Sequence, residues 1–148
     1  MKTVKSMDKI DTLKGICKIY GIALVYLFGS RAEEAYRCLH GNEYMINDPL
    51  ADIDIGVVFL QHLPPAAERY SLYADTFNDM ADLFKPYPVD LSFLQENNAV
   101  FQVEALKGRC VFHIDNHFKD RYEEMILRRS ADFKPILEIF LKEALEGI

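Results

Sequence analysis

The feature that most constrains the fold is an uninterrupted apolar run, Ile22–Phe28, with the sequence IALVYLF between Gly21 and Gly29. A strand with one face in water alternates polar and apolar residues, whereas a continuous apolar run is typical of a strand buried on both faces. The run is also far too short to cross a bilayer. The chain is therefore expected to form a layered domain in which both faces of this strand are covered.

Helical and extended patterns alternate around this strand. Apolar residues at helical spacing predict helices over 5–20 and 31–38, and turn-forming residues predict a loop over 39–51. A second strand is expected over 52–59, followed by a helix that opens at Pro64 and Pro65. In that helix the aromatic stripe Tyr70, Tyr73 and Phe77 is interpreted as core rather than as a nucleobase platform.

The C-terminal half continues the alternation. A strand over 89–94 (VDLSFL) leads into a helix that ends at Gly108, and a short strand is predicted over 110–114. A helical tail follows from about residue 116, in which Pro135 either kinks the helix or starts a final one capped by Asp132. This order predicts an α/β (α+β) fold: a single domain, 1–148, with a mixed sheet of about four strands, helices packed on it and a helical C-terminal tail.

The charge balance restricts the partners. Half of the residues are hydrophobic and the formal net charge is −6, with no long run of lysine or arginine. Proteins that bind nucleic acid usually present a basic face to the phosphates, so nucleic acid is an unlikely partner. Because the sequence contains neither a membrane-spanning run nor a signal peptide, a cytoplasmic location without a membrane partner is expected.

Three aspartates are the candidate catalytic and metal-binding residues. Asp52 and Asp54 lie two residues apart on a predicted strand, so both carboxylates project from one face while Ile53 and Ile55 face the core. Asp90 begins the third predicted strand between two apolar residues, an unusual place for an acid without a partner. Hard oxygen ligands of this kind suit Mg²⁺, and three carboxylates can hold two ions.

The turn Gly29-Ser30-Arg31 is the candidate nucleotide-binding element. Glycine lets a ligand approach the backbone closely, the first amides of the following helix point towards it, and the Ser30 hydroxyl adds a donor. Arg31 either contributes a positive charge or points to solvent. Taken singly, a glycine-serine turn and a DxD pair are common, whereas their order along alternating strands and helices is not.

The stretches LFGSRA, ADIDIGVVF and PVDLSFL resemble the signature of the minimal nucleotidyltransferase (MNT) family within the DNA polymerase beta superfamily. The tail RYEEMILRRSADFKPIL is also similar to that of minimal members. The resemblance implies that Gly29 and Ser30 hold the triphosphate of ATP and that Asp52 and Asp54 bind metal and phosphates. Asp90 would help to deprotonate the attacking hydroxyl.

One departure from the family pattern is the long gap between Ser30 and Asp52, in which 39–51 looks like an insertion at the mouth of the site. It is expected either to contact the acceptor or to be an inert loop.

The resemblance also implies a role and a partner. Many minimal members neutralise a small helical HEPN toxin as its antitoxin, by adenylylating one of its tyrosines, so a HEPN/MNT toxin-antitoxin pair and a hetero-oligomer are expected. Two alternatives stay open: transfer to a small hydroxylated compound such as an aminoglycoside, and a non-catalytic antitoxin that acts by binding alone.

Overall fold

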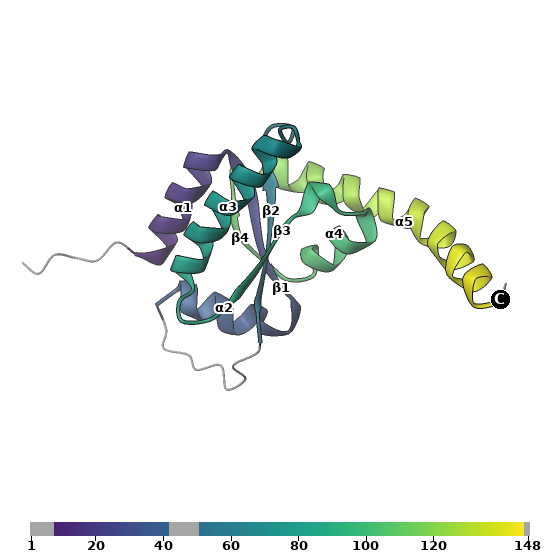
Figure 1. The fold of residues 1–148 in the computed structure, drawn as a ribbon, viewed down its shortest axis with the longest axis horizontal. Helices are drawn as coiled ribbons and strands as arrows, with labels where there is room; N and C mark the ends of the chain where they lie inside the picture. Colours follow the sequence, from purple (N-terminus) through teal and green to yellow (C-terminus); the bar gives the residue numbers. More distant parts are fainter. Residues whose placement is uncertain (1–7, 42–50, 147–148) are drawn as a thin grey trace, which may run out of the picture.

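The computed structural model describes residues 8–41 and 51–146 as a mixed sheet of four strands with helices on both faces (Figure 1). The elements in chain order are α1 Lys9–Tyr20, β1 Ile22–Phe28, α2 Ala32–Leu39, β2 Ile53–Phe59, α3 Ala66–Leu83, β3 Val89–Phe93, α4 Ala99–Leu106, β4 Arg109–His113 and α5 Asn116–Glu146. The strands lie in the order β3-β2-β1-β4. The predicted fold class is therefore confirmed.

β1 occupies an inner position and is buried along its whole length, as its apolar run predicts. It pairs with β2 and with β4 in the antiparallel sense, whereas β2 and β3 run parallel. The parallel pair is joined through α3, as a parallel connection requires a crossover. This crossover places the start of β3 beside the start of β2.

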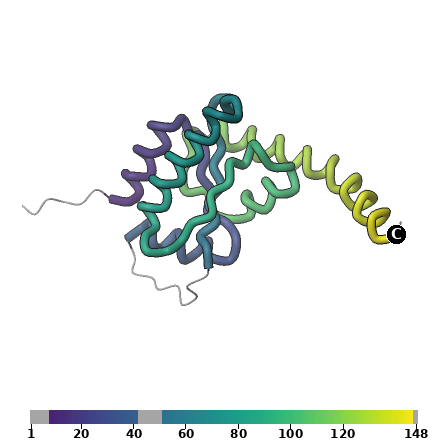
Figure 2. The backbone as a smooth tube through the Cα atoms, in the orientation of Figure 1, coloured from purple at the N-terminus to yellow at the C-terminus, as the bar shows by residue number. Residues whose placement is uncertain are grey.

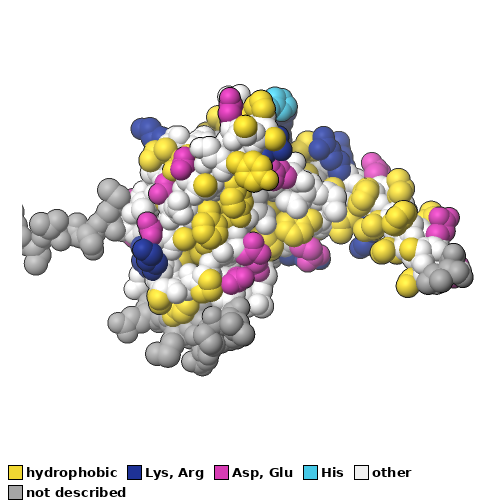
Figure 3. Space-filling view, viewed as in Figure 1, with side chains coloured by type: hydrophobic (Ala, Val, Ile, Leu, Met, Phe, Trp, Pro, Cys, Tyr) yellow, Lys and Arg dark blue, Asp and Glu magenta, His cyan; other side chains and the backbone are white. Residues whose placement is uncertain are grey.

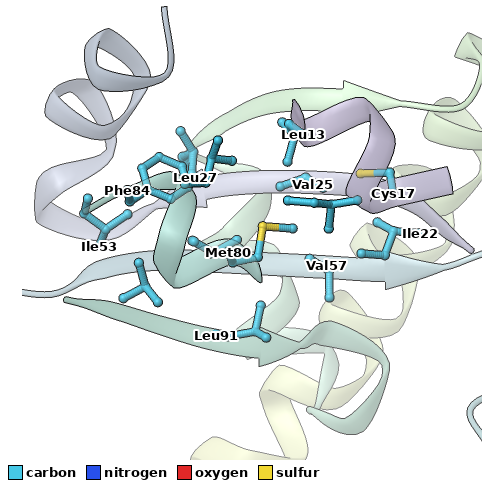
Figure 4. Packing of buried hydrophobic residues seen from close by; sticks show 14 of the residues in the cluster. Leu13, Cys17, Ile22, Val25, Leu27, Ile53, Val57, Met80, Phe84 and Leu91 are labelled. Carbon is cyan, nitrogen blue, oxygen red and sulfur yellow. The ribbon is translucent and has the colours of Figure 1, made fainter. Parts of the chain in front are cut away.

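The main core lies between the sheet and the helices α1, α2 and α3. Figure 4 shows this packing, with Leu13 and Cys17 of α1 and Met80 of α3 against residues of β1, β2 and β3. The opposite face carries a second cluster, in which Tyr26 and Val58 of the sheet pack with Ala105 of α4 and Ile126 of α5. Both faces of the central strand are thus covered.

Several predicted boundaries need correction. The first helix starts at Lys9 with Asp8 as its N-cap, while residues 5–7 lie outside the described part. β2 starts at Ile53 rather than Asp52, and Leu39 is the last residue of α2 rather than the start of a loop. Of the expected insertion, 42–50 lies outside the described residues.

Two further predictions were wrong. Tyr70 is 80% exposed rather than part of the core, because it occupies the outer side of α3, whereas Tyr73 and Phe77 pack against the core as expected. Pro135 does not start a final helix capped by Asp132, since α5 continues through it, and of the two alternatives only a kink within one helix stays open. The tube in Figure 2 shows this helix leaving the body of the molecule. Among the described residues, no helix is long and apolar enough to span a membrane.

Candidate active site

The parallel pairing of β2 with β3 brings two of the predicted aspartates together. Asp54 is the register partner of Asp90, and the flanking pairs are Ile53 with Val89 and Ile55 with Leu91. Because side chains alternate along a strand, the apolar pairs enter the main core while both carboxylates project from the opposite face. Directly paired residues have Cβ atoms about 5 Å apart. The two acids therefore share one small region of the sheet.

Asp52 completes this group from the residue before β2. It is exposed, as is Asp90, whereas Asp54 is half-buried. Burial raises the pKa of the Asp54 carboxyl above its ordinary value, and the charges of Asp90 and Asp52 raise it further. The three carboxylates therefore repel one another at neutral pH, and a cation between them would remove that repulsion.

The group suits a metal ion that is shared with a ligand rather than one enclosed by protein. Within residues 8–41 and 51–146, no three His, Cys, Asp or Glu side chains are arranged to hold a metal by themselves. Mg²⁺ is usually bound through one or two carboxylates, several waters and the phosphates of a substrate. The half-buried Asp54 and the exposed Asp90, whose charges repel each other, fit that mode of binding.

Gly29 lies directly against this group. It follows β1 at the position after Phe28, the register partner of Asp54, and starts a short 3-10 helix, Gly29–Arg31. Its φ is +75°, a conformation that favours glycine. A Cβ at this position would overlap Oδ2 of Asp54 and lie 3.2 Å from its Cγ. The glycine therefore lets the turn and the carboxylate come into contact.

Ser30 and Arg31 continue the turn into α2. Ser30 is exposed and directly follows Gly29, the residue that lies against Asp54. Arg31 is half-buried, and its guanidinium lies 3.9 Å from the Glu34 carboxylate. The three predicted turn residues are thus placed together with the aspartates, although their roles in binding nucleotide stay predictions.

Two basic residues near the turn were missed by the sequence analysis. A cavity of about 330 Å³ extends from Gly29 between α2 and the start of β4, and it is lined by Lys107 and Arg109. Arg109 donates two hydrogen bonds to Glu33, at 2.8 and 3.1 Å, and its guanidinium lies 4.2 Å from the centre of the Tyr36 ring. No local pattern marks these residues, because only the pairing of β4 with β1 brings them to the turn.

The comparisons with known proteins agree with this architecture. The family model described as Polymerase beta, Nucleotidyltransferase matches residues 11–117, which span the turn and all three aspartates. None of the curated proteins matches the chain.

Solved structures with the same fold come from toxin-antitoxin complexes. A chain from the tri-AMPylated Shewanella oneidensis HEPN toxin in complex with MNT antitoxin is 16% identical, with a TM-score of 0.50, covering 90% of this chain and 96% of that one. A toxin-antitoxin structure with AMP-PNP gives 17% identity and a TM-score of 0.53 over 89% of this chain and 98% of that one. The toxin-antitoxin MntA-HepT gives 17% and 0.50, over 90% and 97%.

Proposed function

Because this chain belongs to the polymerase beta nucleotidyltransferase family, we propose that it transfers AMP from ATP to a hydroxyl group, with Mg²⁺ as the cofactor. The observation that carries the proposal is the register of β2 and β3, which pairs Asp54 with Asp90 on the face where Gly29 touches Asp54. A metal-assisted transfer of a nucleoside monophosphate requires carboxylates that bind the metal beside a turn that binds the phosphates.

Asp52, Asp54 and Asp90 hold the metal and the reacting groups in this proposal. When bound, Mg²⁺ neutralises charge on the triphosphate and lowers the pKa of the acceptor hydroxyl. The acceptor oxygen attacks the α-phosphorus, the bond from that phosphorus to the bridging oxygen breaks, and pyrophosphate leaves. Asp90 accepts the hydroxyl proton, since it is the exposed member of the pair at the sheet edge.

The triphosphate occupies the turn and the cavity beside it. Gly29 and Ser30 contact the phosphates through backbone amides and the hydroxyl, and Arg31 adds positive charge. Lys107 and Arg109 line the same cavity together with their ion-pair partners, Glu104 and Glu33. Arg109 donates two hydrogen bonds to Glu33, which orient its guanidinium. In this proposal Arg31 and the bound Mg²⁺ supply the positive charge that the triphosphate and the three aspartates require.

The acceptor in this proposal is a tyrosine of a partner HEPN toxin, which the chain neutralises as an antitoxin in the cytoplasm. The support is the shared fold with chains solved in toxin-antitoxin complexes, one of them with a tri-AMPylated toxin and another with AMP-PNP. The three carboxylates lie on a face of the sheet that α4 and α5 cover only in part, with Asp52 and Asp90 exposed. An open site of this kind admits a protein side chain.

The test is a transfer assay with radiolabelled ATP, Mg²⁺ and the HEPN protein encoded beside this chain. The wild-type protein should label the toxin on tyrosine, as located by mass spectrometry of its peptides, and Asp52→Asn should abolish labelling. Folding of the variant is checked by circular dichroism.

The same assay separates the alternatives. A labelled small compound in place of the toxin would assign the chain to small-molecule modification. If neither the wild type nor Asp54→Asn transfers nucleotide and Asp54→Asn still protects cells from the toxin, the chain neutralises the toxin by binding alone.

A further inference from the structure

The end of α5 forms an arm, defined here as residues 127–146, that projects from the body of the molecule (Figures 1 and 2). The only residues of α5 that are buried, Tyr122 and Ile126, lie before the arm. At 1.5 Å per residue the arm extends about 30 Å. An isolated helix of this length is marginal in water, so a projecting arm indicates a missing partner.

The arm carries large apolar side chains in the open. Six of them are more than half exposed: Leu127 55%, Ile136 64%, Ile139 59%, Phe140 67%, Leu141 52% and Leu145 78%. The space-filling view shows hydrophobic atoms gathered along this end of the chain (Figure 3). Contiguous exposed apolar surface of this kind marks an interaction site.

The charges of the arm are divided between its two halves. Residues 127–136 contain three basic side chains (Arg128, Arg129, Lys134) and one acidic side chain (Asp132). Residues 137–146 contain three acidic side chains (Glu138, Glu143, Glu146) and one basic side chain (Lys142). A helix with one basic half and one acidic half complements a copy of itself that runs in the opposite direction.

A groove at the root of the arm offers a place for the end of a second arm. It has a volume of about 920 Å³ and lies between the end of β2 and α5. Its apolar lining includes Leu60, Phe118 and Met125, and Arg121 and Arg129 line it as well. Acidic residues, Asp115, Glu124 and Asp132, line the groove too, and Arg128 is paired with Glu124. The groove therefore matches the apolar end of the arm in polarity, and Arg129 is available in it for an acidic residue of that end.

We infer that two copies of this chain associate by antiparallel exchange of their arms, so that each arm ends in the groove of the other copy. Arg129 and Glu143 each lie seven residues from Ile136, which places all three on one flank of the helix. In a two-fold antiparallel pair centred near Ile136, Arg129 of each copy lies beside Glu143 of the other. A two-fold interface is self-complementary in this way.

The dimer leaves the proposed active site open. The groove begins at Val58 and Phe59 at one end of β2, whereas Asp54 lies near the other end of that strand. The dimer and the transfer reaction are therefore separate properties, and either one can fail without the other.

The test measures the mass of the full-length protein in solution by sedimentation velocity, from about 1 to 200 µM, a range that spans dissociation constants of micromolar order. The wild type should shift from monomer to dimer across this range. Arg129→Glu and Glu143→Arg should each remain monomeric, because each places like charges together, and the double reversal should restore the dimer. Lys142→Glu is the matched control and should dimerise normally, because Lys142 lies about 100° around the helix from Glu143 and so away from the flank that carries Arg129 and Glu143.

Three results would overturn the inference. One is a wild-type monomer at every concentration, and another is a dimer that survives either single reversal. The third is a monomer whose arm is needed for binding the HEPN protein, seen as loss of that complex in Phe140→Asp. Because Phe140 is 67% exposed, this substitution should leave the fold intact, which circular dichroism verifies.

Discussion

At the scale of single residues, Asp54 has the most informative environment. Its carboxylate is half-buried, faces Asp90 across the strand pair and touches the backbone of Gly29. Such a placement disfavours the ionised form and lowers stability unless a cation is bound. A residue that weakens the fold in this way is typical of a functional site.

The first prediction concerns the pH dependence of stability. Because the folded-state pKa of Asp54 is raised, its contribution to stability is full below the unfolded pKa and is lost as the pH rises through the folded pKa. Asp54→Asn should therefore raise the free energy of unfolding at pH 7 without Mg²⁺, by about 0.5 kcal/mol after solvent screening. Below about pH 4 the gain should vanish. Urea unfolding at both pH values measures it, and a loss of stability at pH 7 would contradict the prediction.

The second prediction compares two glycines with positive φ. Gly29→Ala adds a Cβ that collides with Asp54, whereas Gly21, at φ +69°, has nothing within 4 Å of the added atom. Gly21→Ala should cost about 1 kcal/mol from backbone strain alone. Gly29→Ala should cost about 1–3 kcal/mol and lower transfer activity at least 100-fold. Equal activity in the two variants, measured per folded molecule, would show that the contact with Asp54 has no role.

At the scale of elements, the sequence predicted the order and type of the strands and helices well. The apolar run gave β1 with its true bounds, and the alternation in residues 89–93 matches a strand whose Asp90 and Ser92 face outwards. The pairing of Asp54 with Asp90 could not be predicted from the local sequence pattern. The register of β2 and β3 depends on where α3 returns the chain to the sheet. Lys107 and Arg109 were missed for a similar reason.

The third prediction concerns the attachment of α5 to α4. The buried Tyr122 hydroxyl donates a hydrogen bond to Oε1 of Gln102, whose Nε2 donates to the carbonyl of Asn97 at 2.8 Å. Tyr122→Phe leaves the Gln102 oxygen without its donor, at a cost of about 1–3 kcal/mol. Tyr70→Phe, on the exposed side of α3, is the matched control and should change stability by less than about 0.5 kcal/mol. Equal unfolding midpoints in urea would contradict this account.

At the scale of the whole molecule, the body and the arm obey different constraints. The body buries its apolar residues on both sides of one sheet, so its sequence pattern predicts its fold. The arm keeps apolar residues exposed, and its helix continues through the exposed Pro135, which removes one intrahelical hydrogen bond. The sequence predicted a helical tail there, whereas its projection from the body became visible only in the structure.

The central claim is that Asp52, Asp54 and Asp90 form one site for Mg²⁺ and nucleotide. Isothermal titration of the protein with a non-hydrolysable ATP analogue, with and without Mg²⁺, tests it most directly. The account predicts saturable binding that requires Mg²⁺ and is lost in both Asp54→Asn and Asp90→Asn. Asp79→Asn should bind normally, since Asp79 lies between α3 and α1, where it accepts a hydrogen bond from Tyr20, on the other face of the sheet. Binding of equal affinity in the Asp54 or Asp90 variant and the wild type would contradict it.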